Sequence, residues 1–140
     1  MILQVFVPGI PQPQGSKNAY VRGNRAVLVE ANKKLPAWRQ SVVDKLEAEN
    51  VSCEPMTDAV DVSIVFFMPR PKSVTRKLPT VKPDLDKLIR AILDAGTKAG
   101  IYNDDSQVVE IVAYKFYSDE EQPVGALITI SNWFGVSLSD

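Results

Sequence analysis

Three aspartates in the second half of the sequence have the residue type and spacing that suit metal chemistry. Asp84 and Asp86 flank a single leucine, and Asp105 follows in a turn-forming segment. Mg²⁺ prefers oxygen ligands and keeps several waters, so two or three aspartates are enough to hold it. Such an ion polarises a phosphoryl oxygen and lowers the pKa of an attacking water. The pattern therefore favours phosphodiester hydrolysis by metal-activated water, with Mg²⁺ as the cofactor and Mn²⁺ as a substitute.

The residue types that are scarce narrow the chemistry further. The sequence has no histidine and a single cysteine, Cys53. An imidazole base, the usual histidine-containing zinc sites and an all-thiolate cluster are therefore excluded. One cysteine cannot form an internal disulfide, which fits a reducing compartment, so we expect a cytoplasmic protein. The apolar stretch from Ile2 to Val7 is too short for a signal core or a membrane span, and we expect no membrane association.

Charge is distributed unevenly along the chain although the formal net charge is only -1. Between Phe67 and Arg90 seven basic residues face two acids, whereas from Gly100 onward the acids outnumber the bases. The basic segment is either a phosphate-binding face that borders an acidic metal site or an ordinary solvated loop. Its basic residues are Arg70, Lys72, Arg76, Lys77, Lys82, Lys87 and Arg90.

The elements that must position the aspartates follow from hydrophobic periodicity and from Pro and Gly breakers. A small hairpin is expected around residues 22–25, and residues 69–81 should form an exposed basic loop. Strands are predicted over residues 2–7, 60–68, 108–117 and 124–130, and helices over about 36–49 and 85–99. We expect the last two strands to form an antiparallel pair. Residues 1–140 should form a single α+β domain, with a mixed or mostly antiparallel sheet and two main helices packed on it.

The start of the second predicted helix decides whether the aspartates can act together. Two residues on a continuous helix are separated by about 200° of rotation, so Asp84 and Asp86 share a ligand only if Asp84 sits at the extended N-cap. Arg90, one turn beyond Asp86, would offset charge on the pentacoordinate phosphate. Asp105 completes a three-carboxylate pocket only if the fold returns its loop to the start of this helix.

Each of these residues also has a simpler structural explanation. Asp84 would cap the helix, Asp86 would complement its dipole, and Arg90 would pair with Asp86 or Asp94. Asp104 and Asp105 would shape a turn. Taken singly, each residue favours the structural role, and only the combination favours a functional site.

That combination resembles the RusA family of Holliday junction resolvases. The segment is KPDLDKLIRAILDAGTKAGIYNDDSQVVE, residues 82–110. It contains Asp-x-Asp-Lys-Leu at a predicted helix start, a basic residue one turn later, Asp-Ala before a glycine, and Asp-Asp-x-Gln before a strand. The resemblance implies that Asp84, Asp86 and Asp105 hold the metal and that Arg90 is required for cleavage. The family often has lysine at that position; arginine does not deprotonate, so Arg90 retains charge stabilisation but not a general-base role.

The resemblance also implies a substrate and an assembly. It predicts a homodimer that introduces paired nicks across a four-way DNA junction, and a two-fold substrate suits an isologous dimer. The Pro11–Lys17 loop is similar to the phage and prophage branch of the family, and Lys115 matches a recurring family lysine. The DNA-binding residues that we predict are Lys17, Arg70, Lys72, Arg76, Lys77, Lys82, Lys87 and Lys115.

Two other functions remain open from the sequence. A catalytically silent, junction-binding phage accessory protein with the same fold would bind branched DNA without cutting it. An enzyme acting on a nucleotide or sugar nucleotide is the third possibility, because an Asp-x-Asp pair also serves diphosphate-bound Mg²⁺. The +5 charge of the segment from Phe67 to Arg90 exceeds what a mononucleotide requires.

Overall fold

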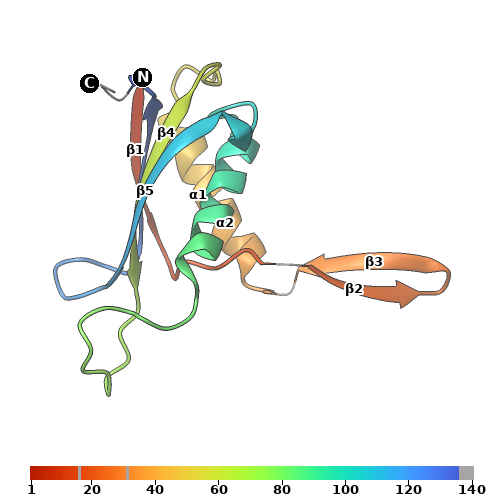
Figure 1. The fold of residues 1–140 in the computed structure, drawn as a ribbon, viewed down its shortest axis with the longest axis vertical. Coiled ribbons are helices and arrows are strands. Elements are labelled where there is room, and N and C mark those ends of the chain that lie inside the picture. The colour runs from red at the N-terminus through yellow and green to blue at the C-terminus, as the bar shows by residue number, and fades with distance from the viewer. Residues whose placement is uncertain (16, 31, 136–140) are drawn as a thin grey trace, which may run out of the picture.

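A four-stranded mixed sheet with two helices on one face forms the body of the molecule (Figure 1). The computed structural model describes residues 1–135 except 16 and 31, and it leaves the side chains of residues 17–21 and 26–30 undescribed. The strand order is β1-β6-β4-β5. The strands are β1 (Ile2–Pro8), β4 (Val60–Met68), β5 (Val108–Tyr117) and β6 (Gly125–Asn132). The predicted α+β class is confirmed.

The first helix, α1 (Leu35–Glu49), begins with proline in its first turn, where a missing N–H costs nothing. Its apolar stripe is buried, with Leu35, Val42 and Leu46 fully covered and Trp38 nearly so. The stripe packs against α2 (Leu85–Lys98) and β1. This packing supplies the frame that holds α2 in place.

The second helix carries the motif and is fixed at its far end by a close contact. Gly100 follows the C-cap with a φ of 71°, the left-handed conformation that favours glycine. The chain then turns so that the buried Tyr102 ring covers Gly96, where an added Cβ would collide with the ring. The Tyr102 hydroxyl donates a 2.7 Å hydrogen bond to the Leu93 carbonyl. These contacts fix the last turns of α2 relative to the loop that precedes β5.

The predicted antiparallel pairing of the last two strands is wrong. β5 pairs in parallel with β4, whereas β6 lies on the other side of β4 and pairs antiparallel with both β4 and β1. Burial explains the outcome, because Ile128 and Ile130 of β6 are fully buried between β1 and β4. β5 is therefore an edge strand rather than one arm of a hairpin.

The edge strand exposes an unusual amount of apolar surface. The helices cover only one face of the sheet (Figure 1). On the other face Tyr114 stacks on Phe116, with ring centroids 5.6 Å apart, and Phe116 contacts Phe67 at 6.5 Å. Val109, Ile111 and Val112 along the same strand are also exposed. β5 thus combines an unpaired backbone edge with exposed apolar side chains.

A two-stranded arm projects from the body. β2 (Lys17–Arg22) and β3 (Arg25–Glu30) form the predicted hairpin, and its tip is the basic turn at residues 22–25 (Figure 1). Arg22 and Arg25 pair at the tip, and Gly23 between them has a φ of 66°. In the chain, the arm follows the loop before β2 and precedes α1. In space, it leaves the body beside the start of α2 (Figure 1).

Candidate nuclease site

Asp84 and Asp86 present their carboxylates to solvent at the start of α2. Asp84 is the N-cap with an extended backbone, φ −69° and ψ 141°, and its side chain makes no capping hydrogen bond. Asp86 lies in the first turn, and its side chain is 75% exposed. The nearest cation is the Lys87 ammonium, 3.8 Å from an Asp86 carboxylate oxygen. Since Asp84 does not cap the helix, its carboxylate is available to a ligand.

The backbone immediately before Asp84 is held by Lys115 of β5. The Lys115 ammonium donates hydrogen bonds of 2.8 Å to the carbonyls of Val81 and Pro83. These bonds tie the end of the basic loop to the sheet. In this structure Lys115 therefore positions the segment that carries Asp84, and its predicted contact with a DNA phosphate stays a prediction.

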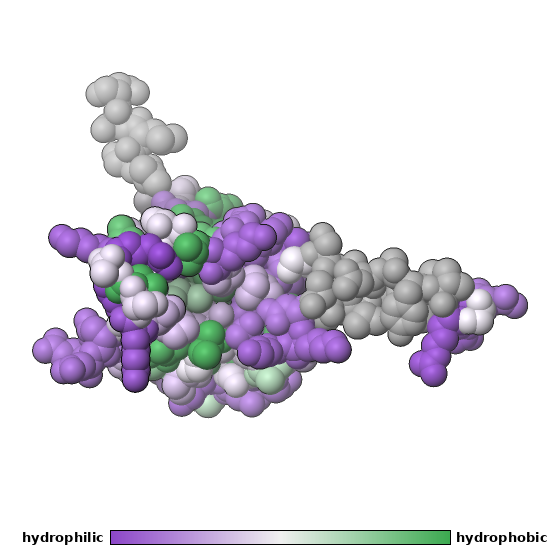
Figure 2. Space-filling model, turned by 90° about the horizontal axis from the view of Figure 1, so that it is seen from below, coloured by the Kyte–Doolittle hydropathy of each residue, from purple (hydrophilic) through white to green (hydrophobic). Residues whose placement is uncertain are grey.

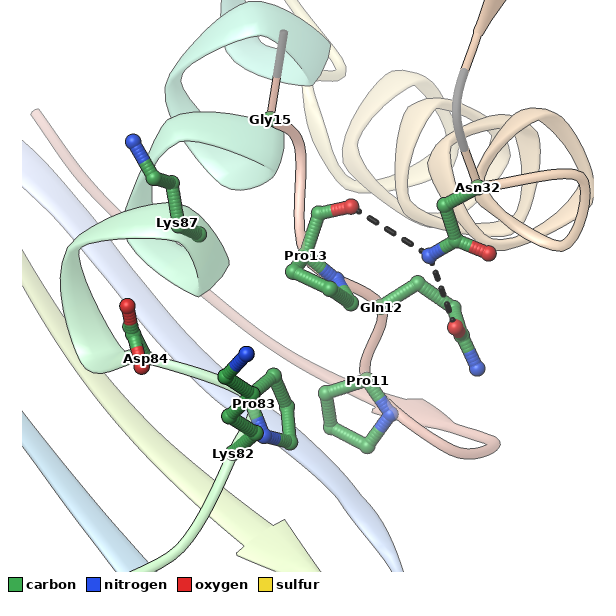
Figure 3. A pocket seen from close by; sticks show the side chains of 9 residues that line it. All are labelled: Pro11, Gln12, Pro13, Gly15, Asn32, Lys82, Pro83, Asp84 and Lys87. Carbon is green, nitrogen blue, oxygen red and sulfur yellow. Dashed lines mark hydrogen bonds between the residues drawn. The ribbon is translucent and has the colours of Figure 1, made fainter.

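A cavity of about 560 Å³ opens next to Asp84. Figure 3 shows the rings of Pro11, Pro13 and Pro83 around it, with Asp84 and Lys87 on the side of α2. Lys82 lines it as well and is exposed to solvent. The walls are thus mainly apolar, with three proline rings among them, and the charged groups on them are two ammonium groups and one carboxylate. The remaining lining residues are Gln12, Gly15 and Asn32.

Hydrogen bonds fix the N-terminal loop that forms half of this cavity. The Gln14 backbone N–H donates to the Lys87 carbonyl at 2.9 Å. The Asn32 amide donates to Gln12 at 3.0 Å and to the Pro13 carbonyl at 3.3 Å (Figure 3). Arg39 of α1 donates to the Gln14 side chain at 2.9 Å. We did not predict this network, because isolated polar residues in a proline-rich loop show no periodicity that would reveal their partners.

Asp105 lies at the opposite end of α2. It begins the short 3₁₀ helix η1 (Asp105–Gln107), which leads directly into β5. Burial is the largest cause of the raised pKa of the Tyr102 hydroxyl, and the negative charges of Asp105 and Asp94 raise it further. α2 spans roughly 21 Å at 1.5 Å per residue, and Asp84 is at its start. The condition for a three-carboxylate pocket, a return of this loop to the start of the helix, is therefore not met within one chain.

The neighbouring Asp104 and Gln107 have structural roles that explain the spacing of their motif. The Asp104 carboxylate accepts a 3.2 Å hydrogen bond from the Ser106 N–H, and hydrogen bonds from Ser106 lower the pKa of Asp104. The Gln107 side chain accepts from the N–H groups of Asn103 and Asp104. It also donates to the carbonyls of Met56 and Asp58. Asp104 and Gln107 thus build the loop, and the Asp105 side chain is exposed at its surface.

Two of the basic residues predicted to bind DNA contact Tyr117 of β5, although both are also exposed to solvent. Arg70 and Arg76 lie over the Tyr117 ring, and Arg76 also donates a 2.8 Å hydrogen bond to its hydroxyl. Arg90 is exposed on α2, and Asp94 pairs with Arg39 and Lys98 rather than with Arg90. The Lys17 side chain lies outside the described part of the chain. Lys72, Lys77 and Lys82 are exposed.

The end of the molecule where α2 begins is mostly hydrophilic. Figure 2 views that end directly and shows hydrophilic side chains over much of it and at the tip of the β2–β3 arm. Lys82 and Lys87 line the cavity beside Asp84, and the loop between β4 and α2 carries further exposed cations at Arg70, Lys72, Arg76 and Lys77. This end of the molecule can therefore attract a polyanion while the carboxylates of Asp84 and Asp86 remain exposed.

The donor set at the start of α2 fits a hard divalent cation in part. Asp84 and Asp86 supply two oxygen-donor carboxylates, which suit Mg²⁺ with waters in the other positions. Among the described residues, no group of three or more acidic, histidine or cysteine side chains lies close enough to hold a metal ion. Within the described part of one chain, Asp84 and Asp86 therefore have no third carboxylate close enough to complete a metal site.

Comparisons with known proteins give one family model and one similar bacterial protein. Residues 8–131 match the family model described as Endodeoxyribonuclease RusA. A relative in Bacillus subtilis (strain 168), named "Uncharacterized protein YqaN", is 29% identical over 132 residues, covering 84% of this chain and 89% of the relative. Within the described residues, no helix is both long and apolar enough to span a membrane.

Proposed function

The chain belongs to the RusA family of endodeoxyribonucleases, and from that premise we propose that it resolves four-way DNA junctions by paired, divalent-metal-dependent nicks. The proposal rests on the exposed Asp84 and Asp86 at the start of α2, where the Asp84 carboxylate makes no capping hydrogen bond. Lys82 and Lys87 lie beside Asp84 in the wall of the cavity. A helix N-terminus with free backbone N–H groups also favours a phosphate. Because the substrate is DNA, we place the activity in the cytoplasm of a bacterial or phage-infected cell.

The residues have separate tasks in this proposal. Asp84 and Asp86 hold the cation, which when bound supplies an activated water and charge stabilisation at the phosphate. Arg90, one turn along α2, stabilises the charge that develops on the phosphate. Cations of the loop between β4 and α2 bind the DNA backbone and set its position. The loop carries Arg70, Lys72, Arg76, Lys77 and Lys82.

We propose further that a second copy of the chain supplies Asp105. β5 is an edge strand with exposed apolar side chains, and such edges pair readily with another strand. If two β5 strands paired antiparallel about a two-fold axis, the start of one strand would lie beside the end of the other. Lys115 near the end of β5 contacts the segment before Asp84, and Asp105 directly precedes the start of β5. The partner's Asp105 would then approach Asp84 and Asp86.

The central experiment compares wild type with Asp86→Asn on a labelled synthetic four-way junction. The denaturing gel should show symmetric nicks that require both Asp86 and Mg²⁺ or Mn²⁺. Asp44→Asn, an exposed aspartate on α1, is the matched control and should cut normally. Binding measured in EDTA should be retained by all three proteins.

One structural observation favours the catalytically silent alternative. The described residues of a single chain form no group of three carboxylates that could hold a metal ion. A silent protein would bind the junction with the same affinity as a nuclease and yield no product with any divalent metal. The absence of nicks across a range of Mg²⁺ and Mn²⁺ concentrations, together with tight binding, would replace our proposal with that function.

A further inference from the structure

The cavity beside Asp84 has walls of two kinds that together suit a nucleotide. Three proline rings provide flat apolar surfaces, and the ammonium groups of Lys82 and Lys87 provide charge (Figure 3). Pro11 is buried, and Pro13 and Pro83 are partly buried. A small polar substrate would leave these rings unused, and a purely apolar ligand would leave the cations unused.

We propose that this cavity takes one unstacked nucleotide of the DNA, next to the phosphate that is cut. The inference rests on the proposed function, because it assigns the cavity to the same substrate. The base would pack against Pro11, Pro13 and Pro83, and its phosphate would face Lys82 or Lys87. Nucleotides at a branch point are easier to unstack than those inside a duplex, so the cavity selects for branched DNA.

The size of the cavity agrees with a single nucleotide. Small-molecule pockets range from about 300 to 1,000 Å³. The cavity, at about 560 Å³, falls within this range and is large enough for one base with its sugar.

Its position agrees with a role beside the reacting phosphate. Asp84 forms part of the wall, and the backbone of Lys87, one residue beyond Asp86, anchors the opposite loop through Gln14. A nucleotide in the cavity therefore lies directly beside Asp84, one of the two proposed metal ligands. The cavity would fix which phosphate reaches them.

The loop that closes the cavity is already organised without DNA. The Asn32 amide donates hydrogen bonds to the Gln12 side chain and to the Pro13 carbonyl. Arg39 donates a hydrogen bond to the Gln14 side chain. A preformed pocket avoids the entropic cost of ordering a loop on binding. The bonds use backbone and amide groups, so the proline rings remain available to the base.

The test uses four-way junctions in which 2-aminopurine replaces one nucleotide at a time near the mapped nick. Its fluorescence rises when the base leaves the stack, so it reports unstacking without any cleavage. In EDTA, full-length wild type should raise the emission severalfold at one position on either side of the nick. Duplex DNA of the same sequence should give no rise.

Two variants alter the cavity, and each has a matched control. Gly15→Trp adds a bulky side chain to the wall at a residue where a Cβ meets no atom within 4 Å. Its control is Ala48→Trp on the exposed surface of α1. Pro13→Ala removes one ring and keeps the carbonyl that Asn32 binds, and Pro55→Ala, at the other end of α2, is its control.

We expect both cavity variants to lose most of the fluorescence rise while they keep the wild-type melting temperature and bind the junction. Both controls should behave as wild type. The inference is wrong if no position near the nick brightens, or if Gly15→Trp and Pro13→Ala brighten as wild type does. The nicking assay is scored separately: an intact rise without nicks would reject the nuclease function, and nicks without a rise would reject only the cavity's role.

Discussion

At the scale of single residues, the fold uses the adjacent carboxylates of Asp104 and Asp105 differently. The Asp104 carboxylate accepts a hydrogen bond from Ser106, and the Asp105 side chain faces solvent. Asp104→Ala should therefore lower the melting temperature, because the loop before β5 loses its cap. Asp105→Asn should keep the melting temperature and reduce nicking about 100-fold or more, the loss typical of removing one charged group from a catalytic site. Thermal scans and junction cleavage measure the two effects.

The stabilising effect of Asp104 should depend on pH in a defined direction. Hydrogen bonding lowers the pKa of Asp104 in the folded protein. Its contribution is then complete above the unfolded-state pKa of about 3.9, and it disappears as the pH falls through the folded-state pKa. The melting-temperature difference between wild type and Asp104→Ala should narrow in acid. A constant difference from about pH 7 to about pH 2 would contradict the assignment.

Sequence reasoning at this scale found the aspartates but not all of their uses. The motif does not distinguish the capping Asp104 from the exposed Asp105, because both are compatible with a turn. The position of Asp84 at an extended N-cap was correct, since Pro83 precedes it and two helical residues could not share a ligand. The absence of a capping bond from Asp84 depends on side-chain geometry, which spacing does not encode.

At the scale of elements, Lys115 connects the sheet to the site. Its ammonium donates to the carbonyls of Val81 and Pro83, just before Asp84. Lys115→Met should loosen this segment, so the Mg²⁺ concentration for half-maximal nicking should rise severalfold while the affinity for DNA in EDTA changes little. Lys77→Gln, an exposed cation of the loop between β4 and α2, is the control and should weaken DNA binding without changing the Mg²⁺ requirement. The opposite pattern would show that Lys115 contacts phosphate directly.

The sequence predicted where the elements lie better than how they pair. Periodicity located both helices and the four strands of the sheet, because alternation and the 3.6-residue repeat are local signals. The pairing of β5 with β4 joins residues far apart in the chain, and nothing local distinguishes it from pairing with β6. The short connection between β5 and β6 favoured a hairpin, but burial of β6 between β1 and β4 outweighed it.

At the scale of the whole molecule, the edge strand β5 leaves the apolar side chains of Val109 and Ile111 exposed. If β5 forms the dimer interface, Val109→Lys should produce monomers, since a charge on an edge strand opposes pairing. Light scattering coupled to size exclusion measures the change in mass. Lys45→Glu is an exposed charge-changing control on α1, which packs against β1 at the opposite edge of the sheet, and it should remain dimeric.

The separation of Asp105 from Asp84 and Asp86 along α2 permits a decisive test of the shared site. Asp86→Asn and Asp105→Asn homodimers should each fail to nick. If each site takes Asp105 from the partner, a mixed dimer of the two variants contains one doubly altered site and one intact site. It should therefore nick one strand of the junction. If both residues served a site within one chain, every site in the mixed dimer would carry one substitution and no nick would form. Co-expression with two affinity tags isolates the mixed dimer, and strand-specific labels count the nicks.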